Sequence, residues 1–108
     1  KLTGPMITQA AAAGDATAAE LLAEIGSWLG TGLANLASAF DPGAFVIGGG
    51  VSAAGEMLLK PAREAFRKQL PGRGYRPEAR IVQAQLGNEA GLIGAADLAR
   101  SAVEEDIA

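Results

Sequence analysis

The stretch AFVIGGGVS at residues 44–52 joins a short apolar run to three glycines and then to a sequence that favours a helix. A short apolar run bounded by turn residues is typical of a strand buried on both faces of a parallel sheet. Because glycine lacks a Cβ, Gly48, Gly49 and Gly50 let the backbone approach a ligand closely. The first N–H groups of a following helix would attract an anion such as a phosphate. These features predict a nucleotide-binding corner.

Two helices are predicted before the strand. The first covers residues 5–13 and stops at Gly14, a residue type that readily adopts the conformation ending a helix. The second begins after Asp15, whose carboxylate can accept hydrogen bonds from the first turn, and runs to Phe40. The Asp-Pro-Gly sequence at residues 41–43 ends it, because a residue before proline avoids the helical region.

The long second helix carries two stripes. A glycine costs up to ~1 kcal/mol of helix propensity, so a stripe of small residues indicates that another element approaches closely. That element is either a packed helix or a bound base. The small stripe consists of Gly26, Gly30, Ala34 and Ser38. The apolar stripe, at three- and four-residue spacing, consists of Ala18, Leu21, Leu22, Ile25, Leu29, Leu33, Leu36, Ala37 and Phe40.

After the glycines, residues 52–70 predict a third helix. Gly55 weakens its start, and Pro61 either kinks it or opens a second piece at its first turn. The sequence further predicts a loop at 71–77, a strand at 80–86, a turn at 87–88 in which Asn88 caps the next helix, a helix at 90–103 and a frayed tail at 101–108. The last helix would pack through Leu92, Ile93, Ala96, Ala99 and Val103.

The predicted order is therefore α-α-β-α-β-α, an α/β arrangement. A strand, a crossover helix and a second strand imply a parallel pair. Two strands are too few, because a parallel sheet normally has more strands and is covered on both faces. We expect the sheet to be incomplete in this chain, with the remaining strands in polypeptide upstream of Lys1.

The composition bounds the chemistry of the chain. Its 108 residues include no cysteine and no histidine, which excludes disulfides, thiolate nucleophiles and imidazole catalysis within it. The lack of cysteine is compatible with the cytoplasmic localisation that we expect. Residues 25–40 carry no charge, but acidic flanks without basic anchors favour a buried helix over a membrane span.

The basic residues are concentrated in one window. Residues 60–80 carry +5, and the remainder carries −8. Glu56, Lys60, Glu64 and Lys68 alternate at four-residue spacing, the pattern of a solvated helix face rather than of a nucleic-acid site. Asp41 and Asp97 are interpreted as a helix terminator and a polar helix position, without a catalytic role.

Several segments together resemble a known family. Residues 30–36 (GTGLANL), 41–42 (DP), 46–52 (VIGGGVS) and 86–96 (LGNEAGLIGAA) are similar to the C-terminal part of bacterial ROK-family sugar kinases, in particular actinobacterial ATP-dependent glucokinases. The resemblance extends from Gly4 to about Arg100. A loose dinucleotide pattern, G-x-G-x-x-A at residues 48–53, is a weaker interpretation, because no acidic residue ends the next strand at the expected distance.

The resemblance implies a fold, a reaction and a set of partners. The fold would be actin-like or hexokinase-like (ribonuclease H-like), with the whole chain forming the C-terminal portion of one α/β domain. The intact protein would use ATP and Mg2+ to phosphorylate glucose at its 6-hydroxyl, with an aspartate as general base. Gly48, Gly49 and Gly50 would contact the nucleotide near its α-phosphate and ribose. A homo-oligomer is expected, without nucleic acid or membrane as a partner.

The family's other motifs are absent from this chain. They are the phosphate loop, the asparagine–aspartate pair carrying the base, the glutamate–glycine–histidine sugar motif and the zinc motif rich in histidine and cysteine. In the family's order all of them would lie upstream, so the segment is expected to be inactive alone. The alternative is the C-terminal region of a ROK-family sugar-responsive transcriptional repressor.

Overall fold

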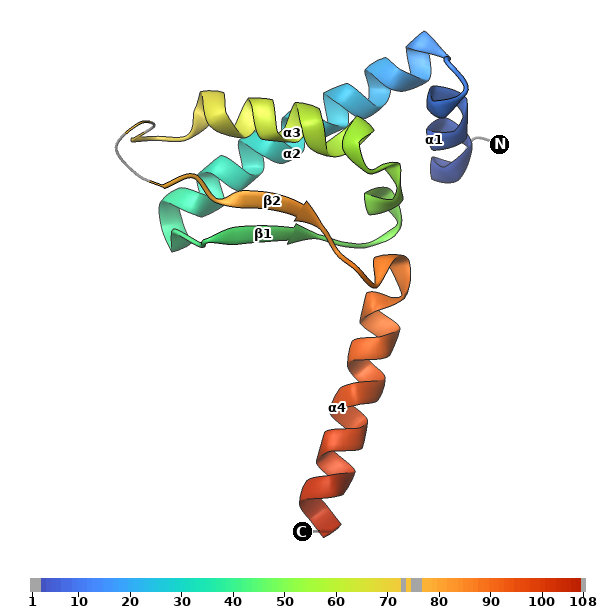
Figure 1. Cartoon of the computed structure of the whole chain (residues 1–108), viewed down its shortest axis with the longest axis vertical. Coiled ribbons are helices and arrows are strands. Elements are labelled where there is room, and N and C mark those ends of the chain that lie inside the picture. Colours follow the sequence, from blue (N-terminus) through green and yellow to red (C-terminus); the bar gives the residue numbers. More distant parts are fainter. Residues whose placement is uncertain (1–2, 73, 75–76, 108) are drawn as a thin grey trace.

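The computed structural model describes residues 3–72, 74 and 77–107, the side chains of residues 88, 90 and 107 excepted. The predicted order of helices and strands is confirmed, and two short 3-10 helices are added to it (Figure 1). The elements are α1 (Gly4–Ala12), α2 (Ala16–Phe40), β1 (Ala44–Ile47), η1 (Gly50–Ala54), α3 (Glu56–Gln69), β2 (Arg80–Gln83), η2 (Gly87–Glu89) and α4 (Ala90–Ile107).

Side-chain caps fix the starts of α1 and α2. Thr3 accepts a hydrogen bond from the Met6 N–H at 3.4 Å, and Asp15 accepts one from the Ala18 N–H at 3.1 Å. The predicted role of Asp15 is thereby confirmed. Helix α2 ends at Phe40 as predicted, and Asp41 then adopts a left-handed conformation with φ of 44°. No helix in the described ranges is long and apolar enough to cross a bilayer.

The two strands form the predicted parallel pair. Their register runs from Ala44 opposite Arg80 to Ile47 opposite Gln83. The predicted extension of the second strand to Leu86 is wrong. The Ala84 N–H still donates to the Ile47 carbonyl at 2.8 Å, but β1 ends there and leaves the following residues without a partner strand.

The segment after the glycines departs from the predicted helix at 52–70. Residues Gly50–Ala54 form the 3-10 helix η1, and α3 starts only at Glu56. Gly55 separates the two with φ of 60°, a conformation that breaks regular helix geometry. Pro61 lies inside α3 rather than opening a second helix, so that alternative is wrong.

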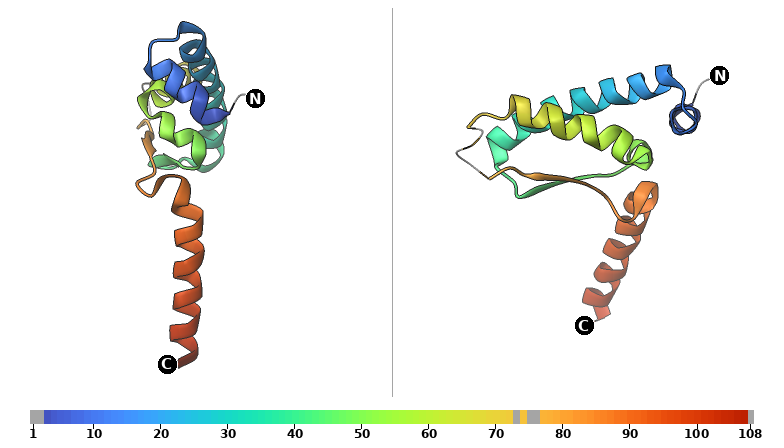
Figure 2. Two further views of the ribbon diagram at one scale, coloured as in Figure 1. Left: turned by 90° about the vertical axis from the view of Figure 1, so that its right-hand side faces the viewer. Right: turned by 45° about the horizontal axis from the view of Figure 1, so that its top comes forward.

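Helices α2 and α3 lie side by side over one face of the sheet (Figures 1 and 2). Between them and the sheet lies a core in which the rings of Phe45 and Phe66 meet edge to face, with centroids 6.0 Å apart. Gly26 and Gly30 of the small stripe lie against the backbone of α3, which confirms close helix packing there rather than a groove for a bound base. Ala34 is buried as well, whereas Ser38 is exposed. The buried core residues are Leu33, Ala34, Ala37, Leu59, Phe66, Leu70 and Ile81.

The other face of the sheet is open. The side chain of Val46 in the middle of β1 is 65% exposed. The solvent-accessible surface area is 7481 Å², whereas about 5,600 Å² is expected for a complete folded protein of this mass. The radius of gyration is 17.1 Å, against about 13 Å for a compact domain. The structure thus agrees with the prediction of an incomplete sheet.

Helix α4 projects away from the two layers (Figure 1). It continues to Ile107, so the predicted end at Val103 and the frayed tail from Ser101 are wrong. Arg100 pairs with Asp97 and with Glu104 across successive turns, and these bonds support the helical end. The same two carboxylates, Asp97 first, raise the pKa of Arg100. The residues predicted to pack are exposed here, namely Leu92, Ile93, Ala96, Ala99 and Val103.

Candidate nucleotide-binding corner

The glycine corner, Gly48–Gly50, lies at the carboxyl end of β1 and is exposed along its whole length. Gly49 has φ of 82° and ψ of −179°, a region that only glycine occupies without strain. Gly48 has no such requirement: its φ is not positive, and an added Cβ would meet only the Ala84 Cβ at an ordinary 3.7 Å. The backbone conformation therefore explains Gly49, but neither conformation nor packing gives a reason for glycine at position 48.

Ser52 holds the backbone of this corner through two hydrogen bonds to Gly49. Its hydroxyl donates to the Gly49 carbonyl at 2.6 Å, and its backbone N–H donates to the same oxygen at 3.2 Å. The residue is only 1% exposed. The predicted α-helix start at this place is wrong, since η1 is a single short 3-10 segment. What remains of the prediction is an exposed backbone without side chains at Gly48–Gly50.

A mostly apolar cavity of about 490 Å³ opens beside the corner. Its volume falls within the range of small-molecule sites, roughly 300–1,000 Å³. Three elements build it: α1, the first half of α2, and η1. Polar atoms come from few side chains, those of Thr8 and Gln9 among them. The lining residues are Gly4, Pro5, Ile7, Thr8, Gln9, Leu22, Ile25, Gly50, Val51 and Ala53.

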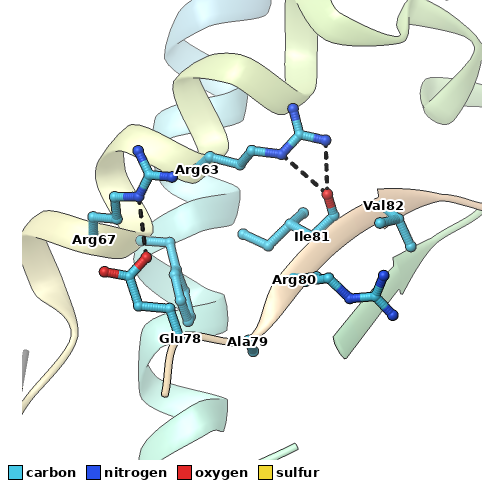
Figure 3. A pocket seen from close by; sticks show the side chains of 8 residues that line it. Arg63, Arg67, Glu78, Ala79, Arg80, Ile81 and Val82 are labelled. Carbon is cyan, nitrogen blue, oxygen red and sulfur yellow. Dashed lines mark hydrogen bonds and ion pairs between the residues drawn. The ribbon is translucent and has the colours of Figure 1, made fainter. Parts of the chain in front are cut away.

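A second cavity, of about 310 Å³, lies between α3 and β2 (Figure 3). Its lining is part charged and part apolar, and two of its arginines are engaged: Arg63 donates to the Ile81 carbonyl, and Arg67 pairs with Glu78 at 3.1 Å. The glycine corner does not line this second cavity. The second cavity is therefore not part of the predicted nucleotide site.

The described residues contain no group of three or more acidic side chains that could hold a metal ion. Asp41 ends α2, and the exposed Asp97 is paired with Arg100 on α4, which agrees with the structural roles predicted for both. The exposed face predicted at Glu56, Lys60, Glu64 and Lys68 is confirmed.

The model of one protein family, ROK, matches residues 1–102. The chain belongs to the ROK family. A glucokinase of Streptomyces coelicolor is 48% identical over 99 residues, which cover 92% of this chain and 31% of that protein. A glucokinase of Halalkalibacterium halodurans is 47% identical over 94 residues, which cover 86% of this chain and 28% of that protein. The chain thus spans about a third of the length of the relatives it matches.

Solved structures of the family share the fold. The ROK family glucokinase from Streptomyces griseus, in complex with glucose and AMPPNP, matches 88% of this chain and 30% of its own, with 54% identity and a TM-score of 0.83. The ROK hexokinase from Thermus thermophilus matches 96% of this chain and 34% of its own, with 38% identity and a TM-score of 0.69. The predicted family and fold class are confirmed.

Sequence reasoning missed two features of the site region. Helix α1 forms a wall of the apolar cavity, but its alanine-rich sequence carries no signal beyond helix formation. Arg63 has a long-range role on β2, 18 residues away, that no local pattern reveals. The glycine corner itself was detectable because strand, glycines and helix are contiguous in the sequence.

Proposed function

We propose that this chain is the nucleotide-side part of an ATP-dependent glucokinase that phosphorylates glucose at its 6-hydroxyl. The observation that carries the proposal is the exposed glycine corner beside an apolar cavity. A flat base needs apolar walls with few polar groups, and the cavity supplies them. The sugar and phosphates of a nucleotide need close approach to backbone, and Gly48–Gly50 supply it.

ATP fits the residues that are present. The base would lie among Ile7, Leu22 and Ile25, and the ribose and α-phosphate would lie over Gly48 and Gly49. When bound, ATP supplies the phosphoryl group that is transferred. The part of the protein formed by this chain would hold the nucleotide in position and exclude water around its base. Such positioning accounts for much of phosphoryl-transfer catalysis.

The kinase is favoured over the repressor alternative by the relatives. The matched proteins are named glucokinases, and a further one, 42% identical over 93 residues, is the bifunctional enzyme NanE/NanK of Brucella melitensis. The solved neighbour holds glucose and AMPPNP together. We extend both ligands to the intact protein of which this chain is a part.

The rest of the machinery belongs to the intact protein. We expect its general base, its Mg2+ site and its structural zinc site outside these 108 residues, together with the sugar pocket. The segment alone is then inactive, and coupled-enzyme assays of the purified 108-residue chain should detect no glucose 6-phosphate. The proposal also includes a homo-oligomer in the cytoplasm, without nucleic acid or membrane partners.

Replacement of Gly48 by alanine in the intact protein tests the nucleotide site most directly. The Cβ meets no close neighbour and the backbone is unstrained, so the melting temperature without ligand should stay within about 2 °C, as expected for an unstrained substitution. The Kd for AMPPNP should rise while the Kd for glucose is largely kept. An unchanged Kd for AMPPNP would show that Gly48 is not part of the nucleotide site.

Gly49 and Gly55 provide a strain-matched pair. Both have positive φ, and neither has any atom within 4 Å of an added Cβ, so Gly49→Ala and Gly55→Ala should each cost roughly 1–3 kcal/mol of stability. Only Gly49 belongs to the corner. Isothermal titration with AMPPNP should therefore show weakened binding for Gly49→Ala and near-normal binding for Gly55→Ala. Equal weakening by both would attribute the effect to strain alone.

A further inference from the structure

Ser52 is buried although its side chain is polar. Only 1% of the residue is exposed, and among the buried residues of the described ranges it is the one with a polar side chain. A buried hydroxyl is unfavourable unless it forms a hydrogen bond, and its bond to the Gly49 carbonyl, at 2.6 Å, meets that requirement. The Ser52 N–H already donates to the same oxygen at 3.2 Å, so the hydroxyl adds a second donor to an acceptor that has one.

Other hydroxyls of the chain bond to backbone carbonyls in a different setting. Those of Ser27, Thr31 and Ser38 donate to the carbonyls four residues earlier in α2, at 3.0 to 3.1 Å. Their acceptors lie inside a regular helix, whose own hydrogen bonds fix the peptide planes. Gly49 lies outside the helices and strands, with φ of 82° and ψ of −179°. At this position the two bonds from Ser52 determine how the peptide is oriented.

The peptide between Gly49 and Gly50 has two accessible orientations. A flip of this peptide changes ψ of Gly49 and φ of Gly50, and glycine accommodates both settings because it has no Cβ. In a trans peptide the C=O and the N–H point to opposite sides, and the described residues contain no cis peptide bond. With the carbonyl held by the buried Ser52, the Gly50 N–H is turned away from Ser52. Gly50 is exposed, so this N–H is directed to the outer side of the corner.

We propose that Ser52 is a positioning residue, whose hydroxyl holds the Gly49–Gly50 peptide with its N–H toward a phosphate of the bound nucleotide. This role rests on the proposed function, since it takes the glycine corner as the nucleotide site. In the held orientation a charged phosphate oxygen meets a hydrogen-bond donor. In the flipped orientation it would meet the Gly49 carbonyl oxygen, which repels it. The hydroxyl thereby favours ligands that carry a phosphate, without touching them.

Ser52→Ala in the intact protein tests this role with two ligands, AMPPNP and adenosine. Both carry the base and the ribose, but only AMPPNP carries phosphates. Alanine fits the space of serine, and the N–H of residue 52 still serves the Gly49 carbonyl, so the fold should be retained. Isothermal titration should show a Kd for AMPPNP raised roughly three- to tenfold, as expected for one lost hydrogen bond. The Kd for adenosine should stay nearly unchanged.

Ser38→Ala is the matched control. It removes the same kind of hydroxyl-to-backbone bond, but from α2, where the acceptor is the Ala34 carbonyl. Both Kd values should therefore equal those of the wild type. If Ser52→Ala does not fold, the Gly50 amide of the wild-type protein, labelled with 15N-glycine, decides by NMR. A shift with AMPPNP that adenosine does not produce would support the proposal, and equal shifts with both ligands would overturn it.

Equal weakening of AMPPNP and adenosine binding by Ser52→Ala would mean that Ser52 only maintains the fold, and would overturn its positioning role. Unchanged AMPPNP binding would overturn it as well. Gly48→Ala, titrated in parallel, separates this failure from failure of the proposed function. If Gly48→Ala weakens AMPPNP binding and Ser52→Ala does not, only the role of Ser52 is refuted. If neither variant weakens it, the glycine corner is not the nucleotide site and both proposals are wrong.

Discussion

The Cα of Gly30 in α2 lies so close to the backbone of Ala62 in α3 that a Cβ on Gly30 would overlap the Ala62 carbonyl group. The Ala65 Cβ would stand only 2.9 Å from that added atom. One turn earlier, Gly26 lies in the same way against the Leu58 carbonyl, with the Pro61 ring at 2.9 Å from its hypothetical Cβ. The two glycines set the distance between the helices.

Replacement of Gly30 by alanine in the intact protein should therefore destabilise it by about 1–3 kcal/mol, because the backbone of α3 cannot yield as a flexible side chain would. Gly32→Ala is the matched control. Nothing lies within 4 Å of its added Cβ, and alanine improves helix propensity by up to ~1 kcal/mol. In urea unfolding, the midpoint should fall below that of the wild type for Gly30→Ala and rise above it for Gly32→Ala. Similar midpoints would mean that the close approach of α2 and α3 is not tight in solution.

The cap of α2 gives a second prediction. Asp15 Oδ1 accepts from the Ala18 N–H, and removing it should cost about 1 kcal/mol. Asp15→Ala in the intact protein should lower the unfolding midpoint in urea, whereas Asp15→Asn should retain most of the stability, since asparagine caps equally well. If both variants lose the same stability, the charge of Asp15 matters rather than its hydrogen bond.

The open sheet face gives a third prediction, for the isolated 108-residue chain. Its surface is about a third larger than that of a complete domain of the same mass. Thermal unfolding followed by circular dichroism should be broad and non-cooperative, or the chain should self-associate to cover its apolar surface. A sharp two-state transition of a monomer, with agreeing calorimetric and van't Hoff enthalpies, would contradict this.

Local signals explain which parts of the fold could be predicted. The start of α2 follows from Asp15, its end follows from residues 41–43, and the strand at β1 follows from four apolar residues before glycines. Each of these signals lies within a few residues of the element it defines. The direction of the strand pair follows from the crossover helix alone.

The features that could not be predicted depend on distant partners. The second strand stops at Gln83 because β1 ends opposite it, and nothing in the sequence of residues 84–86 marks that limit. Likewise, α4 continues to Ile107 with the support of the ion pairs of Arg100, while its large apolar side chains Leu92, Ile93, Leu98 and Val103 are exposed. The asparagine cap predicted at Asn88 concerns a side chain outside the described set.

In the candidate site, too, some features follow from the local sequence and others depend on distant segments. The glycines and their exposure follow from the sequence, whereas the cavity beside them depends on how α1 folds back against α2 and η1. A wall made of Ile7 and Leu22 requires two helices that meet at an angle. The spacing of residues within either helix does not determine the angle between the two helices.

The register of Ala44 opposite Arg80 has a kinetic consequence. Joining positions so far apart along the chain requires a long loop to close, and non-local pairing of this kind slows folding. Contacts between α2 and α3, such as that of Gly30 with Ala62, join positions almost as far apart along the chain. We therefore expect the helix pair and the ladder to form together, in a single slow step of folding.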